Sequence, residues 1–139
     1  MAQNKCGWLS EGTAAHLLGG DVAVAAQQTE EGEGTCSFHR QQGAVAYTLD
    51  VSVQRKADNA CAHANSKGLT NLSGIGNEAV LCSLHPSAEE FVDAVAGRVR
   101  ELNFTVSLST RGLPKTAMPL DARRSVVSQV AEQVAGALF

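Results

Sequence analysis

A chain of 139 residues with 44% hydrophobic residues can bury a core of its own, and its composition is too apolar for an intrinsically disordered protein. Its 11 basic and 14 acidic residues give a net charge of -3, and no segment is strongly basic, so we expect no nucleic-acid partner. No apolar run approaches the ~20 residues that a membrane-spanning helix needs. We therefore predict a single domain over residues 1–139.

The first predicted element is a short N-terminal helix. Ser10 is a favourable N-cap, and Glu11 suits the positive end of a helix. The glycine pair at Gly19 and Gly20 then ends it. We expect this helix to pack its apolar residues on the rest of the domain.

Three strands are predicted next, over residues 22–27, 35–39 and 45–53. The last has the clearest pattern, because Val45, Tyr47, Leu49, Val51 and Val53 alternate with small or polar residues. One side of such a sheet is apolar and the other is wet, as in an antiparallel sheet covered on one face. The sequence therefore predicts a central strand with an apolar inner face.

Two helices and one strand are predicted in the second half. A helix begins near Asp58 and ends at Gly68, a strand covers residues 78–84 with Cys82 facing the core, and an amphipathic C-terminal helix covers residues 121–138. Between them, residues 87–103 remain ambiguous. A stripe of apolar residues four apart favours a helix, whereas a strand, a turn and a second strand through Leu108 would make a hairpin.

The four cysteines, Cys6, Cys36, Cys61 and Cys82, include no C-x-x-C pair, which argues against a redox motif and the usual zinc spacing. They fit two disulfides, for which three connectivities are open. Each bridge would contribute about 3–4 kcal/mol by the chain-entropy argument. Because disulfides persist outside the cytosol, we expect the mature part of an exported protein, from which the leader has been removed.

A metal site is the sharper alternative, because three of the cysteines have a histidine close by. The pairs are Cys36 with His39, Cys61 with His63, and Cys82 with His85. Residues three apart on a strand point to opposite faces, and residues two apart on a helix lie about 200° apart, so each pair diverges. We therefore predict no tight metal site and no cofactor. A metal-binding exported protein that uses the three histidines remains the alternative function.

The wet face of the predicted sheet is the candidate binding surface. It carries short polar side chains: Thr35, Ser37, His39, Thr48, Asp50 and Ser52. A catalytic trio built from Ser37 or Ser52 with His39 and Asp50 is conceivable, but almost any sheet surface offers such a set, and no G-x-S-x-G, S-x-x-K or H-E-x-x-H motif is present. We predict a non-enzymatic binding or interaction domain without catalytic residues.

The order of these signals resembles a known family. The likeness lies in Cys6–Ser10 before a helix that ends at Gly19, in Gly34–Phe38, in Ser73–Ala79, in Arg98–Leu108, and in the terminal helix. Together they are similar to the extracytoplasmic domains of unknown function found in actinobacterial cell-envelope lipoproteins. The likeness extends from Cys6 to Phe139.

The resemblance implies an α+β fold similar to the PsbP-like fold, with a twisted antiparallel sheet, helices packed on one face, a short N-terminal helix and a C-terminal amphipathic helix. It implies a Cys6–Cys36 disulfide and favours the hairpin over residues 91–108. The second bridge, Cys61–Cys82, is predicted instead from the sequence pattern, because both cysteines lie on apolar faces. It also implies a secreted or cell-envelope protein that meets the membrane only through a lipid anchor. Its expected partner is a cell-envelope protein or a small polar ligand.

Overall fold

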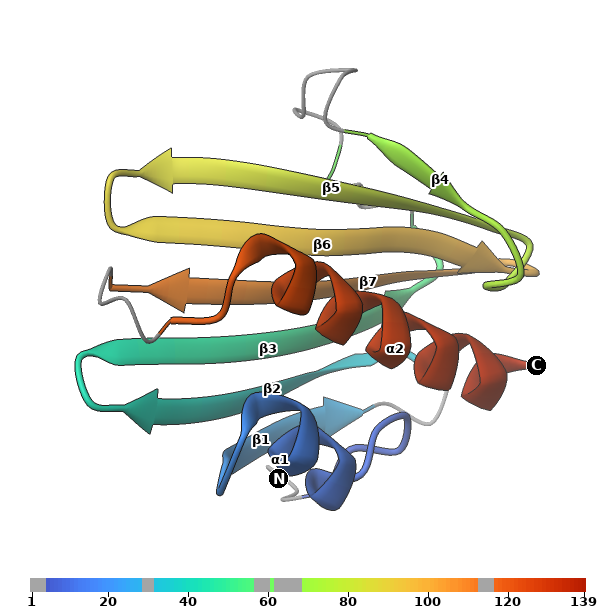
Figure 1. The fold of residues 1–139 in the computed structure, drawn as a ribbon. Helices are drawn as coiled ribbons and strands as arrows, with labels where there is room; N and C mark the ends of the chain where they lie inside the picture. The colour runs from blue at the N-terminus through green and yellow to red at the C-terminus, as the bar shows by residue number, and fades with distance from the viewer. Residues whose placement is uncertain (1–4, 29–31, 57–60, 62–68, 113–116) are drawn as a thin grey trace.

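Figure 1 shows a computed structural model that describes residues 5–28, 32–56, 61, 69–112 and 117–139. One antiparallel sheet dominates it, and a long helix runs across one face. The elements are α1 (Glu11–Leu18), β1 (Ala23–Gln28), β2 (Gly34–Gln42), β3 (Val45–Gln54), β4 (Thr70–Leu72), β5 (Glu78–Ser87), β6 (Glu90–Val99), β7 (Leu102–Arg111) and α2 (Leu120–Leu138). We call the sheet face covered by α2 the inner face and the opposite one the outer face.

The sheet has seven strands in the order β1-β2-β3-β7-β6-β5-β4, and each neighbouring pair is antiparallel. Because β7 pairs with β3, the segment after β3 must cross to the far edge, and the chain then returns strand by strand to the centre. Strands make up 50% and helices 23% of the described residues. The predicted α+β class is therefore wrong, and the fold is β-rich.

The local predictions for residues 10–53 are confirmed. Ser10 Oγ accepts a hydrogen bond from Thr13 N at 3.1 Å, and Gly19 ends α1 in the left-handed conformation with φ 91°. Strands β1, β2, β3 and β5 lie where alternation predicted strands, although most extend a few residues further. The helix predicted over residues 58–68 lies outside the described residues, apart from Cys61.

The hairpin is confirmed and the helix that local periodicity favoured is wrong. β6 and β7 pair continuously from Glu90↔Arg111 to Val99↔Leu102. Helix and hairpin are hard to distinguish here by sequence pattern. Residues 91, 95 and 99 are four apart, and a spacing of four fits both the helical period and the period of two of a strand. They therefore share one face of a helix and one face of a strand equally well. Asp93 and Gly97 lie between them on the same strand face. Neither has an apolar side chain, so they interrupt the alternation that would indicate a strand.

Asp93 and Gly97 each have a structural reason for their place on the inner face. Asp93 is fully buried and accepts a hydrogen bond from Arg123 Nε of α2 at 2.7 Å. At Gly97, an added Cβ would lie 2.4 Å from Phe104 Cζ, so the ring of β7 occupies the space of a side chain. Both positions depend on neighbours distant in sequence.

The inner face and α2 enclose the main core. All five apolar residues predicted for the central strand β3 are at most 1% exposed. On α2, the buried stripe includes Val127, Val130, Ala131 and Val134. A polar contact just before the first turn of the helix helps to position it, because Met118 N donates to the Tyr47 hydroxyl at 3.0 Å. No helix in the described part of the chain is both long and apolar enough to span a membrane.

Both predicted disulfides are present, Cys6–Cys36 and Cys61–Cys82. The expected direction of Cys82 is wrong, however. Ala79 and Leu81 face the main core from β5, while Cys82 lies on the outer face in a small separate cluster with Cys61 and Ala94. Cys61 therefore lies on this face, and the small Ala94 and Ala96 allow its close approach.

Candidate functional site

The six polar residues predicted on the wet face lie together on the outer face. Across β2 and β3 they form three directly opposed pairs: Thr35 with Ser52, Ser37 with Asp50, and His39 with Thr48. The Ser37 hydroxyl donates a hydrogen bond to Asp50 Oδ1. His39 Nδ1 lies 3.2 Å from Thr48 Oγ1. The pairing explains the patch, because opposed residues on adjacent strands share a face.

Strand β7 extends this patch with residues that sequence reasoning missed. Ser109, Ser107 and Thr105 are directly opposed to Thr48, Asp50 and Ser52, respectively. The alternation over residues 104–108 was visible in the sequence. What was missing was the partner strand, because a local pattern does not show that β7 inserts beside β3. The outer face therefore carries hydroxyl groups across three neighbouring strands.

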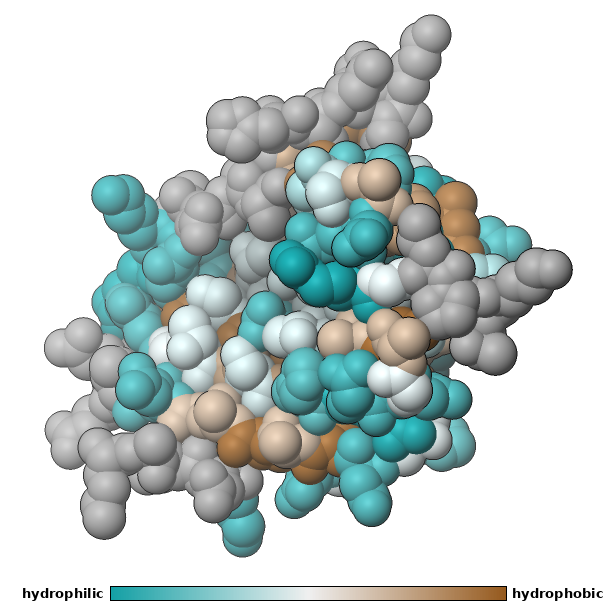
Figure 2. Space-filling model, turned by 90° about the vertical axis from the view of Figure 1, so that its left-hand side faces the viewer, coloured by the Kyte–Doolittle hydropathy of each residue, from teal (hydrophilic) through white to brown (hydrophobic). Residues whose placement is uncertain are grey.

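A shallow hollow of about 520 Å³ lies on this face, and we call it the outer hollow. It is lined by His39, Ala46, Thr48, Asp50, Glu90, Val92, Ser107, Ser109 and Arg111. Glu90 is held in place, because Ser109 Oγ donates to its Oε2 at 2.9 Å and Arg111 Nη2 lies 3.5 Å from the same oxygen. Figure 2 views the molecule from the left-hand side of Figure 1, where mainly hydrophilic and near-neutral residues surround smaller apolar areas.

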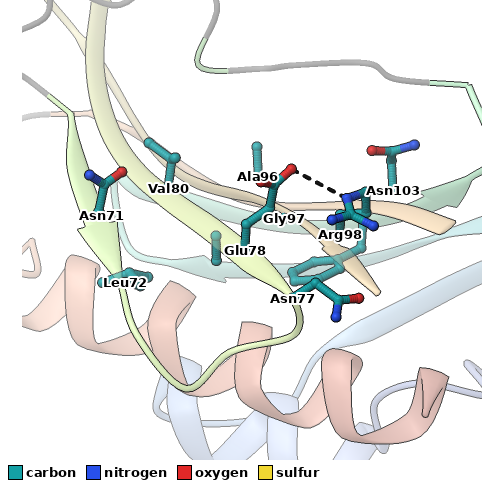
Figure 3. A pocket seen from close by; sticks show the side chains of 11 residues that line it. Asn71, Leu72, Asn77, Glu78, Val80, Ala96, Gly97, Arg98 and Asn103 are labelled. Carbon is teal, nitrogen blue, oxygen red and sulfur yellow. Dashed lines mark hydrogen bonds and ion pairs between the residues drawn. The ribbon is translucent and has the colours of Figure 1, made fainter. Parts of the chain in front are cut away.

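A second hollow of about 450 Å³ lies at the other end of the strands (Figure 3). Its polar groups mostly bind one another or the backbone of nearby turns. Arg98 Nε is 3.3 Å from Glu78 Oε1, and Asn77 Oδ1 accepts from the backbone N of Arg100 at 2.6 Å. Asn103 Nδ2 donates to the carbonyl of Arg55 at 2.9 Å. Because these groups already brace the turns, the outer hollow is the better candidate site.

Of the three histidines of the alternative metal function, the two that the structure describes do not come together. His39 lies on the outer face, whereas His85 stacks on Phe91 at 4.3 Å between ring centroids, beside Arg123 on the inner side. His63 lies outside the described residues. The four cysteines are all in disulfides. In the part of the chain that the structure describes, no group of three or more His, Cys, Asp or Glu side chains is arranged to hold a metal ion.

The serine, histidine and aspartate of the outer face do not form a relay. Ser37 binds Asp50 directly, and His39 binds Thr48 instead of either one. A nucleophilic triad needs the imidazole between the hydroxyl and the carboxylate. The arrangement favours hydrogen bonding to a ligand over proton transfer.

Comparison with known proteins adds no further information. No protein-family model, no curated protein and no solved structure matches this chain.

Proposed function

We propose that this chain is an exported, non-enzymatic binding domain of the bacterial cell envelope, of the kind found in actinobacterial lipoproteins, and that it binds a polar ligand or partner through its outer face. Two disulfides indicate an oxidising, extracytoplasmic environment. The resemblance in the order of sequence motifs supports the narrower placement in the cell envelope and the lipid anchor.

One observation carries the binding role. Hydroxyl, carboxylate and imidazole groups from β2, β3 and β7 face one way and surround a hollow of about 520 Å³. Ligand sites are typically concave and hold a few fixed polar groups that set orientation. Here the polar groups lie on paired strands in the middle of the sheet, which hold them more rigidly than a loop would.

The test is a binding screen on the oxidised protein with a blocked variant. The panel contains neutral oligosaccharides, acidic peptides, basic peptides and single amino acid amides, followed by ligand-detected NMR and calorimetry. Ser107→Arg places a long side chain in the lining of the outer hollow, directly opposite Asp50, and Ser125→Arg on the exposed side of α2 is the matched control. We expect at least one class to bind the wild type and the control and to bind Ser107→Arg at least tenfold more weakly. No binding by any class, or equal binding by Ser107→Arg, would refute the proposal.

A further inference from the structure

Two carboxylates on the outer face are neutralised by a cation directly opposite them on the next strand. Glu78 of β5 is opposed to Arg98 of β6, with 3.3 Å between Oε1 and Nε. Glu90 of β6 is opposed to Arg111 of β7, with 3.5 Å between Oε2 and Nη2. Opposed pairs of unlike charge stabilise a sheet, so this arrangement is the expected one.

Asp50 departs from this arrangement. It stands on the central strand β3, where its opposed neighbours are Ser37 on one side and Ser107 on the other. Its carboxylate accepts the Ser37 hydroxyl, and within the described residues no cationic group contacts it. The side chain is half-buried, so water solvates its charge less well than on an open surface. A carboxylate in this position favours a cation supplied from outside.

The rest of the outer hollow suits a positive group. Its lining holds two carboxylates, Asp50 and Glu90, against the guanidinium of Arg111, which already contacts Glu90, and the imidazole of His39, which contacts Thr48. The hydroxyl oxygens of Thr48, Ser107 and Ser109 supply further acceptors around it. No Phe, Tyr or Trp among the described residues lines the hollow, so a sugar ring would find no aromatic side chain to stack on. An anionic ligand would meet the charge of Asp50 without compensation.

We propose that the outer hollow binds a primary ammonium group of a ligand or partner, with Asp50 as its counter-ion. This inference rests on the proposed function and names the chemistry of the bound group. An ammonium is a compact charge with three donors, which can reach one carboxylate oxygen and two neighbouring hydroxyls. A guanidinium prefers both oxygens of a carboxylate, and at Asp50 the Ser37 hydroxyl already uses part of the hydrogen-bonding capacity of Oδ1.

The experiment is an NMR titration of the ¹⁵N-labelled oxidised protein with two probes that share the same carbon chain. Nα-acetyl-lysine amide carries the ammonium, and Nα-acetyl-norleucine amide lacks it. We expect saturable shifts of the backbone amides of Thr48, Asp50, Ser107 and Ser109 with the lysine probe and not with the norleucine probe. Asp50→Asn keeps the acceptor for Ser37 and removes the charge, so it should weaken lysine binding at least fivefold. Glu78→Gln at the second hollow is the control and should leave binding unchanged.

The outcomes separate this inference from the proposed function. Equal shifts with the norleucine probe, unchanged binding by Asp50→Asn, or tighter binding of Nα-acetyl-arginine amide would overturn the ammonium assignment. If a member of the panel without an ammonium group binds, the lysine probe does not, and Ser107→Arg abolishes that binding, the proposed function stands and the ammonium is rejected. If no member of the panel binds, both are rejected.

Discussion

The ion pair between Asp93 and Arg123 joins α2 to the sheet and is open to a quantitative test. Asp93 is fully buried, and it accepts from Arg123 Nε at 2.7 Å and from Ser83 Oγ at 2.6 Å. Arg123 is 10% exposed, donates to the carbonyl of Met118 at 3.0 Å, and lies 4.7 Å above the ring centroid of Phe91. The guanidinium is therefore the main compensation for a carboxylate that water does not reach.

Arg123→Met should destabilise the protein by about 3–5 kcal/mol, because it leaves the Asp93 charge buried with a single hydroxyl donor. Methionine keeps much of the apolar volume of arginine, so loss of packing is a minor part of this figure. Against a typical total stability of roughly 5–15 kcal/mol, the effect is large but measurable. Adding Asp93→Asn to this variant should restore about 2 kcal/mol or more, because the amide removes the uncompensated charge and can still accept from Ser83.

The assay is urea unfolding of the oxidised protein, followed by the fluorescence of Trp8, which is buried in the main core. Arg98→Met is the matched control, because it breaks an ion pair whose side chains are 42% and 69% exposed. Exposed pairs contribute about 0–1 kcal/mol, so the control should remain near the wild type. The reasoning fails if Arg123→Met costs less than about 1 kcal/mol, or if Asp93→Asn destabilises the Arg123→Met protein further.

Three other changes test the fold by the same unfolding measurement. Replacing Cys61 and Cys82 together by alanine should cost about 3 kcal/mol, because their disulfide closes a loop with a sequence separation of 21; a cost under about 1 kcal/mol would contradict the bridge. Tyr47→Asp should cost several kcal/mol and Thr48→Asp less than about 1 kcal/mol, since the first side chain is 1% exposed and the second is on the outer face; similar losses would contradict the assigned faces. Gly97→Ala should cost about 1–3 kcal/mol because its methyl group would overlap the aromatic ring beneath it, and an unchanged midpoint would show that the ring can move.

Local chemistry was sufficient to predict the elements of the first half. The boundaries of α1 follow from Ser10 and Gly19, whose capping needs only their own side chain or backbone and the adjacent turn. The faces of β3 follow from strict alternation, which needs only the period of two. Alternation also predicted that Ser37 and Asp50 lie on the same outer face of the sheet, although it could not predict their direct contact.

Residues whose environment comes from distant strands could not be predicted in this way. Cys82 was assigned to the core from its apolar neighbours, but it forms a second buried cluster with Cys61 and Ala94 on the other side of the sheet. Ser107 and Ser109 became part of the candidate site only because β7 pairs with β3. Strand order depends on pairing energies between segments far apart in the chain, and no local period carries that information.

The sequence by itself determined the positions of strands with clean alternation, the two capped ends of the first helix, and the presence of enough cysteines for two bridges. Local periodicity could not decide between helix and hairpin at residues 90–99, and the tertiary structure shows why: the same residues fit both periods until Arg123 and Phe104 occupy the space around Asp93 and Gly97. The tertiary structure alone decided which carboxylates on the outer face are neutralised. Glu78 and Glu90 have cations opposite them and Asp50 has hydroxyls, and that difference exists only once the strand register is formed.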